Sequence, residues 1–240
     1  MAVWEDGSWQ EFANVHPLPE RAFRIGPEDS AKLLMRPPHV LIHSHCSRGV
    51  VEHLDWPSDP DSAQQIASGW TWGIVAVAGS VEGDILSVKY PVFWGDAVPR
   101  QPLLGRSYHW VLSDCFTLMR DYHRSVGIHY RDVPRVRDPN VTDAEGNLYY
   151  PRDHWAHRYY PHWIKELGFV PVDHADRKPG DACFRRGDDS GHLDHCAVYL
   201  GEGKYLEITE KRTSYENIPE DEEKFWMETR ARFYRWKGRK

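Results

Sequence analysis

Hydrophobic positions at helical spacing stand out near the middle of the chain. Leu118, Met119, Tyr122 and Val126 recur so that they share one face of a helix. The preceding pair, Ser113–Asp114, consists of two residues that favour helix N-termini. The pattern therefore predicts an amphipathic helix that begins at about residue 114.

Cys115 falls in the first turn of this predicted helix. Unpaired N–H groups and the helix dipole favour an anion at that end, so a thiol there loses its proton more easily. A thiolate is a strong nucleophile, but it needs a base and a group that orients the base. Cys115 is therefore a candidate nucleophile, although a single cysteine on an apolar helix also suits ordinary core packing.

Strand-like patterns occur farther along the chain. Residues 194–201 and 204–209 are rich in Val, Tyr, Leu and Ile, and glycines separate them. This predicts a β-hairpin with a three-residue loop over Gly201–Gly203. In the register that such a loop imposes, Leu200 faces Lys204.

The same register brings two polar residues together. Ala197 faces Glu207, so His195 and Glu207 point to the same side of the sheet as diagonal neighbours. The carboxylate can accept the imidazole N–H and so hold the ring in one tautomer. Cys115, His195 and Glu207 are therefore the candidate catalytic residues, in the roles of nucleophile, base and orienting group.

The remaining patterns predict a mixed α+β chain. In the second half we expect a polar loop over 132–147, a helix over 154–167, a strand over 182–184 and a last strand or short helix over 225–234. The first half predicts an edge strand over 3–12, a short strand over 23–25, a helix that starts near 26–30 and ends before Pro37, a strand over 39–42, a helix over 64–68, and strands over 70–78 and 85–90. Residues 91–102 hold three prolines and show little periodicity, which predicts a linker, placed at 93–104, between domains 1–92 and 105–240.

Composition excludes several classes of protein. The 240 residues are 40% hydrophobic and 13% aromatic, which indicates a folded chain rather than a disordered one. The net charge of -6, without a basic patch, argues against nucleic-acid binding. No apolar run is long enough to span a membrane, and the N-terminus has no signal-peptide pattern, so we expect neither membrane insertion nor secretion by a signal peptide.

Cysteine and histidine spacings allow two metal-site hypotheses. His43 and His45 follow a buried strand and, being two residues apart, project to the same side, which suits a metal ion. A second set could be drawn from Cys183, His192, His195 and Cys196. Because adjacent strand residues face opposite ways, His195 and Cys196 are poorly placed to share one ion, so we disfavour that site.

Residues 103–236 resemble the NlpC-type cysteine peptidases, a papain-like family of cell-wall endopeptidases. The resemblance rests on three motifs: Asp114-Cys115 at a helix start, Pro179-Gly180-Asp181 before a strand, and the segment Asp194-His195-Cys196-Ala197-Val198-Tyr199-Leu200-Gly201. It implies Cys115 as nucleophile, His195 as base and Glu207 as third residue, where the family usually has His, Asn or Gln. It also implies Tyr108 and Asp194 as oxyanion or substrate residues, with no cofactor for this domain.

Residues 12–90 resemble the JAMM metalloproteases of the MPN fold. The matching residues are His43-Ser44-His45 and Ser58-Asp59-Pro60-Asp61. The resemblance implies that His43, His45 and Asp61 could bind Zn, with Ser58 beside the bound water. The family's general-base glutamate lies on an early strand, and neither Glu5, Glu11 nor Glu20 has the matching context. We therefore expect a truncated, catalytically inactive MPN-like domain.

A JAMM-like domain followed by an NlpC-type domain resembles the tail-assembly protein K family of long-tailed bacteriophages. This resemblance implies a tail-tip peptidoglycan hydrolase that acts by Cys-His thiol catalysis, with peptidoglycan stem peptides as substrate and other tail-tip proteins as partners, located at the virion tail tip. Three alternatives stay open at this point. They are a structural tail-tip component with vestigial sites, a protease that processes a tail protein during assembly, and a metalloprotease centred on His43, His45 and Asp61.

Overall fold

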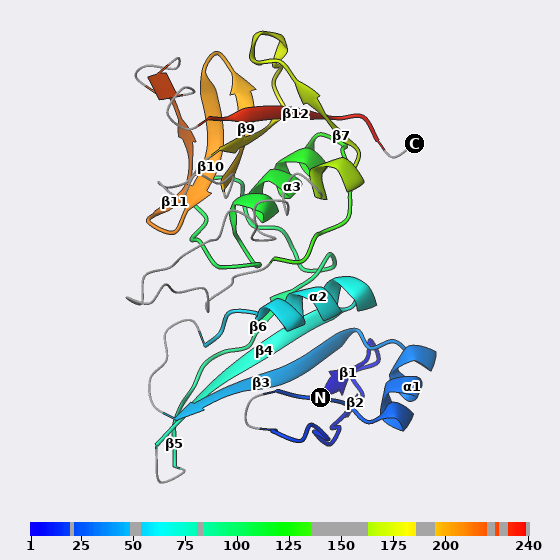
Figure 1. Ribbon diagram of the computed structural model, residues 1–240. Helices are drawn as coiled ribbons and strands as arrows, with labels where there is room; N and C mark the ends of the chain where they lie inside the picture. The colour runs from blue at the N-terminus through cyan, green and yellow to red at the C-terminus, as the bar shows by residue number, and fades with distance from the viewer. Residues whose placement is uncertain are drawn as a thin grey trace, which may run out of the picture. The chain divides into compact units, whose positions relative to one another are not determined.

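The computed structural model describes residues 1–19, 22–48, 54–80, 84–135, 163–185, 195–219, 224–225 and 230–238. They belong to two compact units, Met1–Pro99 and Arg100–Lys240, and each unit has its own sheet (Figure 1). The mixed α and β content predicted from the sequence is confirmed. No helix within the described ranges is both long and apolar enough to cross a membrane.

The first unit has a mixed sheet in the order β2-β1-β3-β4-β5, with β6 also paired to β4. Its elements are β1 (Ala2–Val3), β2 (Trp9–Gln10), α1 (Pro27–Met35), β3 (Val40–Arg48), α2 (Asp59–Ser68), β4 (Thr71–Gly79), β5 (Ile85–Val88) and β6 (Val92–Trp94). Strands β3 and β4 run parallel, and α2 forms the crossover between them. A crossover of this kind is the usual way to join parallel neighbours.

Helix α2 begins and ends where its sequence favours helix termini. Ser58 is the N-cap and forms a capping box with Asp61, which satisfies two backbone N–H groups. Gly69 ends the helix in the left-handed region, at φ 70°, where glycine has no steric cost. The carboxylate of Asp61 is thereby fixed one turn into α2, at the side of the helix that the first unit buries.

Several details of the first unit differ from the prediction. Strand β3 continues through His43 and His45 to Arg48 and does not end at residue 42, and α2 begins at Asp59 and not at residue 64. Residues 3–12 form the hairpin β1–β2 and not one strand, because Asp6–Gly7 make a turn in which Asp6 Oδ1 accepts the N–H of Ser8 at 2.9 Å. Residues 23–25 have no strand. Phe93 and Trp94 belong to β6 and therefore to the sheet, although the expected linker over 93–104 included them.

The second unit contains one antiparallel sheet in the order β11-β10-β9-β8-β12-β7. Its elements are α3 (Cys115–Ser125), β7 (Phe169–Val172), a 3-10 turn (His174–Asp176), β8 (Ala182–Arg185), β9 (His195–Gly201), β10 (Lys204–Thr209), β11 (Arg212–Asn217) and β12 (Arg232–Trp236). Of the helix predicted over 154–167, residues 163–166 are helical, Leu167 lies in a turn, and residues 154–162 lie outside the described residues. Most of the loop predicted over 132–147 also lies outside them.

Helix α3 packs against β9 and β10, as Figure 1 shows. Leu118 and Met119 join the core between helix and sheet, as the helical spacing predicted. Val126 does not, because the helix ends at Ser125 and Val126 is 54% exposed. Phe116 is buried in the same core, so the apolar surface extends to the first turn, beside the nucleophile candidate.

The predicted register of the β9–β10 hairpin is confirmed in the strands and wrong at the turn. Tyr205 pairs with Tyr199 and Leu206 with Val198, as predicted, but Lys204 pairs with Gly201 and not with Leu200. The loop itself therefore consists of two residues, Glu202–Gly203, which have φ of 51° and 74°. Positive φ at both loop residues is the hairpin geometry that matches the strand twist.

Candidate active site and candidate metal centre

A strained loop precedes the nucleophile candidate. His109 and Ser113 form a two-way backbone bridge, with hydrogen bonds of 3.3 and 2.8 Å, which closes a tight loop. Val111 lies inside this loop at φ 68°, a conformation that β-branched residues rarely adopt. Such strain persists only when surrounding contacts enforce it, and it is commonest at functional sites.

Asp114 supplies those contacts as the N-cap of α3. Its carboxylate accepts the N–H of Thr117 at 2.7 Å and the N–H of Val111 at 3.2 Å, so it ties the first helical turn to the loop. The hydroxyl of Thr117 in turn donates to the carbonyl of Val111 at 3.0 Å. The backbone that carries Cys115 is therefore held on both sides.

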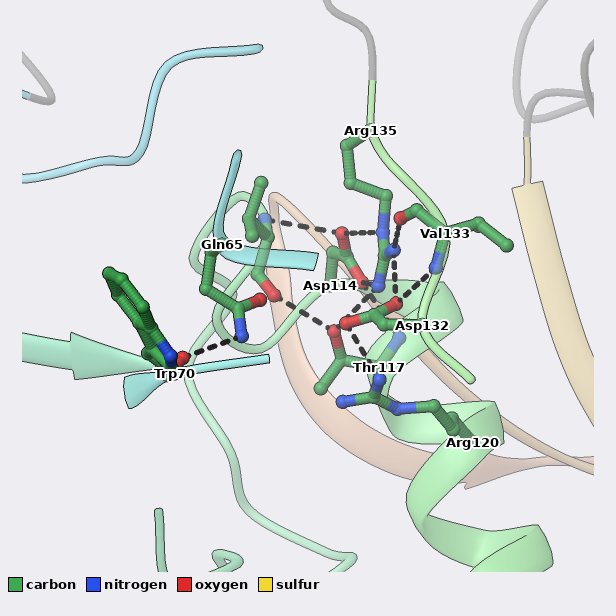
Figure 2. Close-up of polar contacts among 9 residues, drawn as sticks. Gln65, Trp70, Asp114, Thr117, Arg120, Asp132, Val133 and Arg135 are labelled. Carbon is green, nitrogen blue, oxygen red and sulfur yellow. Dashed lines mark hydrogen bonds and ion pairs between the residues drawn. The ribbon is translucent and has the colours of Figure 1, made fainter. Parts of the chain in front are cut away.

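Arg135 compensates the buried charge of this cap (Figure 2). The guanidinium donates to Asp114 from Nε at 2.8 Å, to Thr117 Oγ1 at 3.0 Å and to Asp132 Oδ1 at 2.5 Å. Asp132 also pairs with Arg120, from the middle of α3, at 2.8 Å. Two arginines and two aspartates thus form a charge-balanced network beneath the start of the helix.

Cys115, at the start of α3, interacts with His195, at the start of β9. Hydrogen bonds to Cys115 from the thiol of Cys196 and from His195 outweigh burial and hold the pKa of Cys115 well below its usual value. Burial lowers the pKa of His195, but hydrogen bonds with Cys115 and Glu207 outweigh it and raise that pKa to about 9. Both shifts favour a thiolate–imidazolium pair, which is the reactive form of a cysteine nucleophile.

Glu207 lies on the opposite side of the imidazole. His195 Nε2 and Glu207 Oε2 are 3.1 Å apart, which leaves Nδ1 as the ring nitrogen available to the Cys115 thiol. Burial raises the pKa of Glu207, but the His195 hydrogen bond and the Arg185 guanidinium outweigh it and lower that pKa to about 2. The carboxylate is therefore ionised and can orient an imidazolium.

The remaining predicted residues of this site are placed unevenly. Tyr108 packs, partly buried, against the core cluster that contains Cys115. Asp194 and His192 lie outside the described residues. Cys183 and Cys196 belong to two different core clusters, and no metal-ligating group of the described residues includes either of them.

The first unit brings its three predicted metal ligands together. His43 Nε2 lies 3.2 Å from Asp61 Oδ1, His45 Nε2 lies 3.1 Å from Asp61 Oδ2, and the two imidazole nitrogens are 3.1 Å apart. His43 and His45 are two residues apart on β3, whereas Asp61 comes from α2. Two imidazoles and one carboxylate form the donor set of catalytic zinc sites that keep an open position.

Surrounding groups hold these three side chains in place. The carbonyl of Leu54 lies 2.9 Å from His45 Nδ1, the usual way in which the second nitrogen of a metal-binding histidine is fixed. Ser58 donates to Asp61 Oδ2 from its hydroxyl at 2.6 Å and from its N–H at 2.8 Å. Phe23 stacks on the ring of His43 at 4.6 Å. The residues present fit a zinc ion.

Several polar residues that shape the active site had no local signal in the sequence. Arg135 and Arg185 lie in stretches of mixed charge, and Tyr215 lies on a strand that the sequence pattern did not predict. Each contributes to the site through a contact with a residue on another element, 21, 22 and 8 positions away along the chain, respectively. An arginine three residues after an aspartate, as in Asp132 and Arg135, is too common a pattern to be diagnostic.

Comparisons with known proteins identify the class to which this site belongs. The model of the NlpC/P60 family matches residues 105–235, more than half of the chain and almost all of the second unit. The protein therefore belongs to the NlpC/P60 family, a family of cysteine peptidases.

The chain is also similar to a curated phage protein. The chain is 28% identical over 186 residues to "Tail tip assembly protein K" of Escherichia phage lambda, and the alignment covers 76% of this chain and 75% of that protein. This similarity agrees with the resemblance of the sequence motifs to a phage tail-assembly family. The MPN-like character of the first unit stays a prediction.

Proposed function

We propose that this protein is a cysteine peptidase of a phage tail tip that cuts peptide bonds in the stems or crosslinks of peptidoglycan while the tail penetrates the cell wall. The observation that carries the proposal is the buried arrangement of Cys115, at the start of α3, with His195 on β9 and Glu207 on β10, in a chain of the NlpC/P60 family. The similarity to a tail tip assembly protein supports the location and neighbouring tail-tip proteins as partners.

The chemistry is an acyl transfer in two halves. The Cys115 thiolate attacks an amide carbonyl, a C–S bond forms, and the oxyanion accepts hydrogen bonds from N–H groups at the start of α3, with Tyr108 as a further candidate donor. His195 then gives its proton to the departing amine as the C–N bond breaks. In the second half His195 takes a proton from water, which attacks the thioester, releases the carboxylate product and regenerates the thiolate.

Two features of the site assist these steps. Glu207 holds the imidazole through Nε2, which leaves Nδ1 for the sulfur while the ring is charged. Asp114 and Arg135 fix the backbone on which Cys115 stands. Because the cap charge of Asp114 is neutralised by Arg135, it opposes the thiolate less than an isolated carboxylate would.

The direct test is Cys115→Ala assayed on purified peptidoglycan. We expect the parent protein to release new amino groups from the peptidoglycan and the variant to release none above background. The circular dichroism spectrum of the variant should be unchanged. Cys46→Ser is the matched control, because Cys46 is an exposed free thiol of the first unit and should not affect cleavage. Lysis that survives Cys115→Ala would exclude thiol catalysis at this residue.

Two alternatives are separated by the same preparation. A protease that processes a tail protein would cleave a phage tail polypeptide and release nothing from cell wall. A structural component with a vestigial site would cleave neither, although it would still bind its neighbours in the tail.

The first unit supports a second candidate activity, which is zinc binding at His43, His45 and Asp61. The convergence of their ligand atoms within 4.8 Å of one another favours it. Bound zinc would supply Lewis acidity there, and His45 would be fixed by the carbonyl of Leu54. We expect roughly one equivalent of zinc per chain and a higher melting temperature with zinc, both lost in His45→Ala. An unchanged melting temperature with zinc would contradict this site, and an activity lost on chelation but retained in Cys115→Ala would favour a metalloprotease.

A further inference from the structure

Glu207 is a carboxylate that is 1% exposed and has three polar partners. Oε2 lies 3.1 Å from Nε2 of His195, and the same oxygen accepts a hydrogen bond from Nη2 of Arg185. The other oxygen, Oε1, accepts the hydroxyl of Tyr215 at 2.9 Å. The side chain that orients the imidazole is thus itself held at both oxygens.

These three partners come from β8, β9 and β11, and Glu207 itself lies on β10. Arg185, the last residue of β8, pairs directly with His195, the first residue of β9. Tyr215 on β11 pairs directly with Glu207 on β10. Paired residues point to the same face of a sheet, so the guanidinium reaches over β9 on the face that carries the imidazole. The sheet register therefore brings Arg185 to Glu207, although they are 22 residues apart in the chain.

Without Arg185, the reactive form of the site would hold an uncompensated negative charge. With the Cys115 thiolate, the His195 imidazolium and the Glu207 carboxylate, the buried group carries one net negative charge. An uncompensated charge in a buried site is costly and is removed by a change in protonation. Arg185, whose side chain is 13% exposed, brings the sum to zero.

We propose that Arg185 is a positioning residue of the peptidase: it neutralises Glu207, so that a carboxylate can orient His195 without opposing formation of the Cys115 thiolate. The inference rests on the proposed thiol chemistry. It assigns to Arg185 an effect on the protonation of two residues, the nucleophile and the base, through a third. Phe225, whose ring lies 5.1 Å from the Arg185 guanidinium, helps to hold the arginine over the sheet.

The other ionisable groups beside the site do not replace this charge. Asp114, at the helix start, is neutralised by Arg135. Burial raises the pKa of Cys183 and the pKa of Cys196 above their ordinary values, so both are neutral thiols. Burial, together with the nearby Glu207 carboxylate, also raises the pKa of Tyr215, which remains a neutral donor. Of the described groups that contact Glu207, Arg185 thus supplies the permanent positive charge.

The test is the pH profile of peptidoglycan hydrolysis, together with a titration of the Cys115 thiolate by its ultraviolet absorbance. Arg185→Met removes a positive charge and should move both limbs of the bell-shaped profile upward by roughly one pH unit, because a thiolate becomes harder and an imidazolium easier to form. Glu207→Gln, which keeps a carbonyl acceptor for His195, should move both limbs downward by a similar amount.

The double variant Arg185→Met/Glu207→Gln again has no net buried charge, so its limbs should return toward the parent positions. Arg185→Lys keeps the charge and should keep the parent profile. If Arg185→Met alone does not fold, these two variants and Glu207→Gln still test the proposed role of Arg185. Limbs that stay in place in Arg185→Met, or that move in the same direction in both single variants, would overturn the inference.

Arg235→Met is the matched control for a lost arginine–carboxylate pair. Arg235 donates to both oxygens of the buried Asp181 at 2.8 and 2.7 Å, in the same unit, so its loss should reduce stability and leave the limbs unmoved. The thiolate titration needs no substrate. If the thiolate titration shifts but no hydrolysis occurs, the role of Arg185 is supported and the peptidase function is rejected. If hydrolysis depends on Cys115 but the titration does not shift, the peptidase function is supported and the role of Arg185 is rejected.

Discussion

Replacement of Arg135 by methionine tests whether the network beneath α3 holds the nucleophile in place. Arg135 is 1% exposed, and its guanidinium contacts Asp114, Asp132 and Thr117. Methionine fills part of the volume and keeps the apolar contact with Phe116, over whose ring the guanidinium lies at 4.5 Å. The substitution therefore removes mainly the charge and its hydrogen bonds.

The expected cost follows from what remains. Asp132 keeps its ion pair with Arg120, but Asp114 is left buried with only the two backbone N–H groups of Val111 and Thr117. Removal of one partner of a buried ion pair costs about 3–5 kcal/mol. For a chain of this size that corresponds to a melting temperature lower by roughly 10 °C.

Hydrogen exchange followed on peptides that cover α3 measures this cost where it arises, because local opening there reports the stability of the second unit. Asp114→Asn/Arg135→Met, in which neither charge is buried alone, should recover a substantial part of the loss. Arg36→Met is the control, because its pair with Asp6 is exposed and belongs to the first unit. A loss below about 1 kcal/mol in Arg135→Met would refute the reasoning, since it would mean that water or another cation already screens Asp114.

Three further outcomes are expected. The pKa of Glu207, lowered from 4.5 to about 2, means that its contribution to stability is present above pH 4.5 and is lost as the pH falls toward 2; urea unfolding at acidic pH should show a smaller loss in Glu207→Gln. The pKa of His195, raised from 6.5 to about 9, means that its contribution is present below pH 6.5 and is lost as the pH rises through 9; Cys115→Ala should weaken this alkaline loss. Ser58→Ala removes the cap of α2 and a hydrogen bond to Asp61, so it should cost about 1 kcal/mol of unfolding free energy and weaken zinc binding in a titration.

Local patterns predicted the elements that carry the chemistry. The helix start at Cys115 follows from the N-cap residues before it, and the facing of His195 and Glu207 follows from strand alternation and a glycine turn. Helix α2 was expected only over 64–68, whereas the structure starts it at Asp59, directly after the capping box of Ser58 and Asp61. Asp114 caps a backbone N–H three residues on, and His195 and Glu207 are 12 residues apart, so a single stretch of sequence contains both partners of each interaction.

Predictions based on short patterns were wrong where longer contacts or a single turn decided the outcome. Residues 3–12 alternate as a strand does, yet the turn at Asp6–Gly7 folds them into a hairpin. Strands β7 and β11 were not predicted, because β7 is short and contains Pro171, and β11 is polar. Both are edge strands, which natural sheets keep short, polar or interrupted by proline.

Residue types and their order along the chain were sufficient to predict a thiol nucleophile at a helix start, a histidine base with a carboxylate on the next strand, and a pair of histidines suited to a metal ion. Contacts across the fold chose the rest: the arginine that neutralises the cap and the arginine that neutralises the orienting glutamate. Burial is the physical reason. A charge is costly only where water is excluded, and which charges lose their water, and which opposite charges then reach them, depends on how distant segments pack.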